Sequence, residues 1–327
     1  MSWFSKSRLS VGNVLRSLFA VAVLFSCGAL AAQSPEDLLA AGRVDEAVQV
    51  LHEKIHESPT AESYNQLCRA EYELGAWDAG IAACEKATKL APQNGTYHLW
   101  LGRVYGEKAE HTNFLSAMHL AKKVVAEFQR AVELEPESCE SRADLAEFYV
   151  EAPGIVGGGQ GKARAEAERL AKLNPAMADW VKARLAEKNK DLAGAEQEYR
   201  AAIDASGGGA REWLNLAGFY SHNQRFDDMD LALRNLETSQ LNHPDALVDG
   251  AAMLIRTEMD SPLAIRLLQR YLTTAVEAAP AFQAHAMLGE LLERQGNTSA
   301  AAQEYRASLS MAHSYRLAQD GLKRVTS

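Results

Sequence analysis

The stretch GAWDAGIAACEKATKLAP, residues 75–92, combines small residues, apolar residues at helical spacing and a closing proline, and its pattern recurs along the chain. Three similar stretches also end in proline: GRVDEAVQVLHEKIHESP at 42–59, KKVVAEFQRAVELEP at 122–136 and GKARAEAERLAKLNP at 161–175. Twelve residues before the proline stands a small or slim residue, namely Ala47, Gly80, Val124 or Ala163. This recurrence predicts one similar helix in every unit of a repeat of about 34 residues.

Partner segments with a pattern of their own precede these stretches. Each opens on an aromatic or polar residue, continues with Leu and a small residue, and closes near a large one, as in Trp213, Leu216, Ala217 and Tyr220. The segments are AESYNQLCRAEYELG, GTYHLWLGRVYGEKA, CESRADLAEFYVEA, AREWLNLAGFYSHN and FQAHAMLGELLERQG. Small residues let two helices approach closely, so the two kinds of segment predict pairs of antiparallel helices.

The repeated pattern resembles the tetratricopeptide repeat family, whose W-x-x-L-G-x-x-Y, A-x-x-x-F and P positions it follows over nearly the whole chain. The resemblance implies an all-α, right-handed superhelical solenoid of antiparallel helix pairs, with about seven to eight units in residues 32–327. We expect lengthened units near 108–120 and 152–161 and a degenerate unit at 245–280. The C-terminal HSYRLAQDGLKRV is expected to form a polar capping helix, which solenoids need to cover their apolar end.

The first 31 residues have the features of an export signal. Basic residues precede an apolar run at 18–25, and the ALA sequence at 29–31 forms a small-x-small cleavage site. The apolar run is shorter than the about 20 residues that a transmembrane helix needs. We therefore expect a signal peptide at 1–31, no integral membrane span after cleavage, and a bacterial protein exported to the periplasm. A lipoprotein anchored through Cys27 is the alternative.

Composition narrows the classes of function. The formal net charge is −9, and removal of the leader would make it more acidic, because the leader contains only basic charged residues. Such a chain lacks the basic footprint that nucleic acids and anionic membranes require. The Gly-rich GIVGGGQGKA at 154–163 has Ala where a phosphate-binding loop needs Ser or Thr, so we interpret it as a lengthened turn. We expect no cofactor and a non-enzymatic scaffold.

One segment matches a catalytic motif letter for letter. HEKIH at 52–56 fits the HExxH pattern of zinc proteases, with His52 and His56 as ligands and Glu53 as base. Other repeats fill the two histidine columns with Glu, Lys, Gln and Arg, which is typical of a solvated helix face. A catalytic zinc also needs a third ligand and an enclosed cleft. A zinc-dependent hydrolase is therefore kept only as the alternative function, and no metal site is expected.

In solenoids of this family, first-helix side chains that point away from the second helix line a concave groove. By that logic the partner-binding residues are Asn65, Arg69, Tyr72, Trp100, Arg103 and Asn215. Arg69 and Arg103 are suited to carboxylates, and Trp100 is suited to anchor an apolar group. These positions do not follow the carboxylate-clamp pattern of chaperone-binding members. The expected partner is a protein or peptide whose identity the sequence leaves open.

Cysteine usage fits an exported protein. Cys68 and Cys84 fall on the two helices of one unit, in small-residue columns that are expected to touch. They form either a disulfide, worth about 3 kcal/mol by loop closure, or two buried thiols that fill space. Cys139 has no partner visible in the sequence.

Overall fold

The structure is a computed structural model that describes residues 33–259, 261–274 and 280–327. Its contacts separate Met1–Ala32 from Gln33–Ser327, and the description that follows concerns the second unit alone. The expected signal peptide at 1–31 and the alternative lipid anchor at Cys27 lie outside the described residues.

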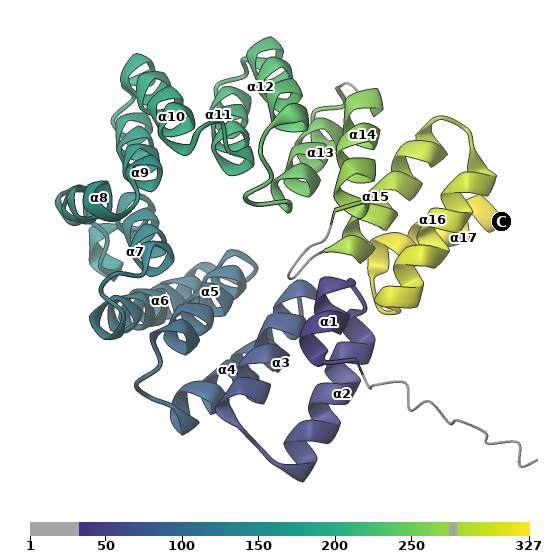
Figure 1. Cartoon of the computed structure of the whole chain (residues 1–327), viewed down its shortest axis with the longest axis horizontal. Helices are drawn as coiled ribbons and strands as arrows, with labels where there is room; N and C mark the ends of the chain where they lie inside the picture. Colours follow the sequence, from purple (N-terminus) through teal and green to yellow (C-terminus); the bar gives the residue numbers. More distant parts are fainter. Residues whose placement is uncertain (1–32, 260, 275–279) are drawn as a thin grey trace, which may run out of the picture. The chain divides into compact units, whose positions relative to one another are not determined.

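Seventeen α-helices and one 3₁₀ helix form the described part of the chain, and Figure 1 shows their succession. They are α1 (Pro35–Ala40), α2 (Val44–Glu57), α3 (Ala61–Glu73), α4 (Trp77–Leu90), α5 (Gly95–Glu110), α6 (Phe114–Leu134), α7 (Cys139–Glu151), η1 (Gly154–Val156), α8 (Gln160–Leu173), α9 (Pro175–Lys188), α10 (Leu192–Ser206), α11 (Ala210–His222), α12 (Phe226–Thr238), α13 (Ala246–Arg256), α14 (Ser261–Leu272), α15 (Ala281–Arg294), α16 (Thr298–Met311) and α17 (Arg316–Thr326). The predicted all-α solenoid of antiparallel helix pairs is confirmed.

Each odd-numbered helix from α1 to α15 pairs with the helix that follows it, and α17 packs on α16 at the C-terminal end. Small residues set the distance between paired helices. A Cβ atom on Gly102 of α5 would lie 2.5 Å from the ring of Phe128 on α6, and one on Gly289 of α15 would lie 2.7 Å from Tyr305 on α16. The small-residue column read from the sequence is therefore the place where the second helix inserts its large side chain.

Side chains at the helix starts fix where many helices begin. Thr60, Asn94, Asn113, Ser138 and Asn174 each accept a hydrogen bond from the backbone N–H three residues later. These N-caps satisfy donors that the first helical turn leaves free. Thr60, Asn94 and Ser138 follow a closing proline and start the next first helix, whereas Asn174 precedes Pro175, the first residue of α9.

The two lengthened regions take different forms. In 108–120 the extra residues extend both helices, so that α5 has 16 residues and α6 has 21. In 152–161 the extra residues form η1 and a Gly-rich turn between α7 and α8. There Gly159 donates its N–H to the carbonyl of Tyr149 at 2.9 Å, and the Lys162 ammonium donates to the carbonyl of Gly157 at 2.8 Å. The lysine is thus held by its own turn.

The first and last helix pairs of this unit contact each other. Phe282 of α15 is fully buried in a cluster with Leu38, Leu39 and Val44 from α1 and α2. The backbone N–H of His313, which follows α16, donates to a carboxylate oxygen of α2 at 2.6 Å. The array from α1 to α17 therefore closes on itself, and its first helices face one another around the inner side (Figure 1).

Candidate functional site

A cavity of about 1190 Å³ lies on the inner side of the array. Its walls come mainly from first helices, namely α3, α5, α7, α11, α13 and α15, together with the segment between α12 and α13. Trp77 of α4, Tyr271 of α14 and Tyr315 before α17 also line it. Volumes of several hundred Å³ and more are typical of ligand sites. Four of the six predicted partner-binding residues line this cavity: Arg69, Tyr72, Trp100 and Arg103.

An aromatic and cationic wall is centred on Trp100 of α5. The guanidinium carbons of Arg69 and Arg103 each lie 5.0 Å from the centroid of its ring, a distance at which cations are attracted to an aromatic face. Tyr72 meets the same ring edge-on at 5.7 Å and meets Trp77 at the same distance. Adjacent repeats thus place their first-helix residues against one another, and the stack holds both guanidinium groups at the cavity.

The two arginines differ in what they contact. The Arg103 Nε donates to Asp144 at 2.6 Å, and one of its terminal nitrogens donates to Glu140 at 3.3 Å. Both acids belong to α7, so Arg103 is neutralised within the chain. The expectation that Arg103 is available to a partner carboxylate is corrected accordingly, because its strongest hydrogen bonds are already formed.

Arg69 has no such partner among the described residues. Its Nε is buried without a hydrogen bond, and its side chain forms no ion pair there. Burial lowers the pKa of the guanidinium, and nearby Arg103 acts in the same direction, while Glu73 opposes the shift. A desolvated charge without a hydrogen-bonded partner is unfavourable in the free protein. Arg69 is therefore a cation at the cavity that has no ion-pair partner among the described residues.

Another part of the cavity lining, called the acidic wall below, consists of three carboxylates. Glu73 at the end of α3, Asp245 before α13 and Asp249 on α13 all line the cavity and interact electrostatically. Burial raises the pKa of Glu73 to about 7, and the two aspartates add to the shift, while Arg69 opposes it. Burial likewise raises the pKa of Asp249 to about 6, although the side chain is exposed to the cavity and its water screens part of the effect.

The remaining predicted residues lie elsewhere. Asn65 is 6 % exposed and its amide nitrogen has no hydrogen bond among the described residues, so it is a core residue of α3 and the prediction that it faces the groove is wrong. Asn215 of α11 lines a second inner cavity of about 300 Å³, which shares Asp249 with the first. His52 and His56 are exposed on α2. Among the described residues no group of three or more His, Cys, Asp or Glu side chains is placed to hold a metal ion.

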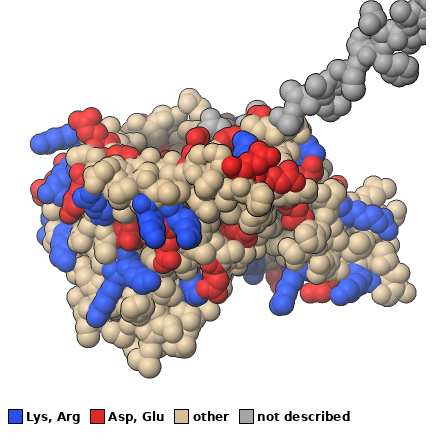
Figure 2. Space-filling view, turned by 90° about the horizontal axis from the view of Figure 1, so that it is seen from below, with Lys and Arg blue, Asp and Glu red and all other residues tan. Residues whose placement is uncertain are grey.

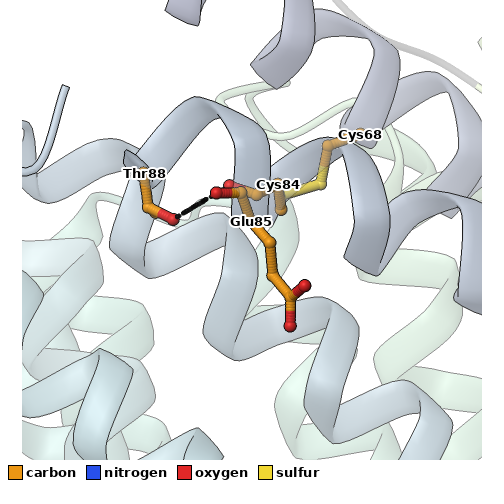
Figure 3. The surroundings of a disulfide bond; sticks show 4 residues. All are labelled: Cys68, Cys84, Glu85 and Thr88. Carbon is orange, nitrogen blue, oxygen red and sulfur yellow. Dashed lines mark hydrogen bonds between the residues drawn. A yellow bond between two sulfur atoms is a disulfide. The ribbon is translucent and has the colours of Figure 1, made fainter. Parts of the chain in front are cut away.

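Cys68 of α3 and Cys84 of α4 are joined by a disulfide in the structure (Figure 3). Their Cα atoms lie 5.2 Å apart and both side chains are fully buried, so the bond staples the helix that carries Arg69 to its paired helix. Thr88, one turn after Cys84 on α4, donates its hydroxyl to the carbonyls of Cys84 and Glu85. The disulfide therefore holds α3 against α4 next to Arg69, at the edge of the cavity.

The outer surface is mixed in charge. On the face seen in Figure 2, Lys and Arg side chains are interspersed with Asp and Glu. Many of these charges pair across repeats, for example Arg184 with Glu151 at 3.0 Å and Arg225 with Glu196 at 2.5 Å. This face lacks the continuous basic stripe that nucleic-acid binding requires. No described helix is both long enough and apolar enough to cross a bilayer.

The fold and the cavity define a class of protein: helical repeat solenoids, a fold that suggests a protein-interaction scaffold and whose members are generally non-catalytic. The sequence model described as tetratricopeptide repeat matches residues 36–95, 161–210 and 268–315. The chain therefore contains tetratricopeptide repeats in these three stretches. No curated protein matches the sequence.

Several solved structures are similar to the chain. The APC/C hetero-tetramer Cut9–Hcn1 matches with 13% identity over 90% of this chain and 54% of its own, at a TM-score of 0.40, so this chain spans about half of that protein. A thermophilic tetratricopeptide repeat protein of Thermus thermophilus matches with 17% identity over 57% of this chain and 96% of its own, at 0.47. A repeat protein of Parabacteroides merdae matches with 14% identity over 82% and 99%, at 0.37.

Proposed function

We propose that the chain is a non-enzymatic scaffold of the bacterial cell envelope that binds an extended protein segment in its inner cavity. The observation that carries the proposal is Arg69, a half-buried guanidinium that forms no ion pair among the described residues, whose Nε is buried without a hydrogen bond, and which lies over Trp100 at a cavity of about 1190 Å³. An unpaired charge of this kind is stabilised when a ligand supplies an anion. The occupant therefore carries an acidic side chain or a terminal carboxylate next to an apolar group.

The contacts of Arg69, Trp100 and Arg103 indicate a different role for each residue. Arg103 is held by α7 and supports the ring of Trp100 from one side, while Arg69 keeps its donors for the ligand. Trp100 offers apolar area close to this donor, and large aromatic side chains in such places supply a large share of binding free energy. Arg69 gives specificity for a carboxylate, and Trp100 gives affinity.

Selection from a displayed library of random peptides on the folded full chain tests the proposal. We expect the selected peptides to be enriched in Asp or Glu next to an apolar residue. Their affinity, measured by fluorescence polarisation, is expected to fall at least about tenfold in Arg69→Gln, the loss of one charge-assisted contact. Arg306→Gln, a change at an exposed arginine of α16, is the matched control and should bind as the parent does. Equal binding by the Arg69 variant would refute the assignment.

The proposed location has its own test. The disulfide between Cys68 and Cys84 supports an oxidising compartment, since such bonds are rare in the cytosol. We expect the mature protein from native envelopes to begin near Ala32 and to be released with the periplasmic fraction. A mature N-terminus at a lipidated Cys27 would replace the periplasmic proposal by a membrane-anchored one.

A further inference from the structure

We infer that the acidic wall of the cavity, formed by Glu73, Asp245 and Asp249 together with Tyr271, binds an organic cation, namely a lysine or arginine side chain or an amino terminus. This inference rests on the proposed function, because the cation belongs to the segment that Arg69 binds. The partner segment then carries both charges, with an anionic group for Arg69 and a cationic group for the acidic wall.

The first argument is the state of the carboxylates. Glu73 and Asp249 form no ion pair with any described residue, and Asp245 approaches the guanidinium of Arg211 only to 3.9 Å. Glu73 and Arg69 lie one turn apart on α3, yet they are not within ion-pair distance of each other. Both charges therefore remain available to groups of a ligand in the cavity.

The second argument is independent of the acids. Tyr271 of α14 is 1 % exposed, lines the cavity, and its hydroxyl has no hydrogen bond among the described residues. Glu73 and Asp245 interact electrostatically with this phenol. A phenol oxygen accepts hydrogen bonds, and its ring attracts cations. An ammonium or guanidinium group donates several hydrogen bonds at once, so it can bond to the Tyr271 hydroxyl oxygen and to the carboxylates together.

Among the described residues, Arg211, His243 and Arg256 are the basic groups that face the two aspartates. Arg211 and His243 interact electrostatically with the aspartates, and burial, together with the nearby Arg211, lowers the pKa of His243. Arg256 acts on Asp249 from its own helix. No described group of His, Cys, Asp and Glu side chains converges as a metal ion would need, whereas an organic cation binds to more widely spaced acceptors.

Three acetylated and amidated pentapeptides of the form Ala-Ala-X-Ala-Ala test the inference, with X as lysine, norleucine or glutamate. Binding is read from the rise in melting temperature of the full chain with peptide concentration. We expect the lysine peptide to bind at least about tenfold more tightly than the norleucine peptide, as one charge-assisted contact allows. The double variant Glu73→Gln, Asp249→Asn is expected to lose this preference while melting no lower than the parent, and Tyr271→Phe should weaken it.

The outcomes separate the two proposals. If the lysine peptide binds no better than the norleucine peptide, or binds equally to the double variant, the cation site is overturned. If the glutamate peptide still binds and depends on Arg69, the proposed function survives that result. If binding of the glutamate peptide does not depend on Arg69 while binding of the lysine peptide depends on Glu73, the anion site at Arg69 is refuted. The cation site at the acidic wall is then retained.

Discussion

Replacement of Glu73 by Gln should stabilise the folded chain, and the gain should grow with pH. Burial raises the pKa of Glu73 from 4.5 to about 7. An acid with a higher pKa in the folded chain binds its proton more tightly there, so the folded state is favoured below pH 4.5 and loses that advantage as the pH rises through 7. The full shift corresponds to an upper limit of about 3 kcal/mol. Because water reaches the cavity, we expect about 1–2 kcal/mol.

Urea denaturation of the parent and of Glu73→Gln at pH 5, 6, 7 and 8 measures this effect, with tryptophan fluorescence and far-UV circular dichroism as probes. The difference in unfolding free energy should be small at pH 5 and reach its full value by pH 8. Glu57→Gln, at an exposed position of α2, serves as the control and should give the same small difference at every pH. A constant difference for Glu73→Gln across this range would show that its carboxylate is solvated like an ordinary surface acid.

Three further changes probe closure, covalent stapling and buried charge. Gly42→Ala should lower the unfolding free energy by about 1–3 kcal/mol, more than Gly296→Ala, because both glycines have positive φ but only Gly42 would place its Cβ 2.5 Å from α15; urea denaturation of both compares them. Replacement of Cys68 and Cys84 by Ala should cost about 2–4 kcal/mol, and reductant should shift the melting temperature of the parent alone. Glu166→Gln, which breaks a buried ion pair, should cost about 3–5 kcal/mol by the same denaturation assay, and an unchanged midpoint would contradict it.

The sequence predicts the repeats and half of the cavity for a clear physical reason. Periodic apolar and small residues report contacts between helices that are neighbours in the chain, as with Gly102 and Phe128. The same register predicts which first-helix side chains face inward, and this places Arg69, Tyr72 and Trp100 correctly at the cavity. Asn65 shares a helix with two of them, but its polar character hides the fact that it is packed into the core.

The acidic wall and the closure depend on contacts that no local pattern reports. Asp249 and Tyr271 lie in the degenerate unit, where the repeat register is lost, and they reach Glu73 because small rotations between successive repeats accumulate around the array. The contact of Phe282 with Leu38 arises from the same accumulation. The partner of Arg103 was within reach of sequence reasoning, because Asp144 lies in the first helix of the next unit.

The position of the two unpaired charges Arg69 and Glu73 at the cavity supports a binding role. Arg142, by contrast, is buried and pairs with Glu166 at 2.6 Å. In the cavity, Arg69 and Glu73 both stay unpaired among the described residues, although either charge could be neutralised by one substitution that the fold would tolerate or favour. Groups that lower the stability of the free protein while facing a cavity are what a preorganised binding site requires, since a ligand with the complementary charges recovers the lost interactions on binding. If Glu73→Gln stabilises the chain and also abolishes its preference for lysine peptides, stability and recognition are opposed at one carboxylate.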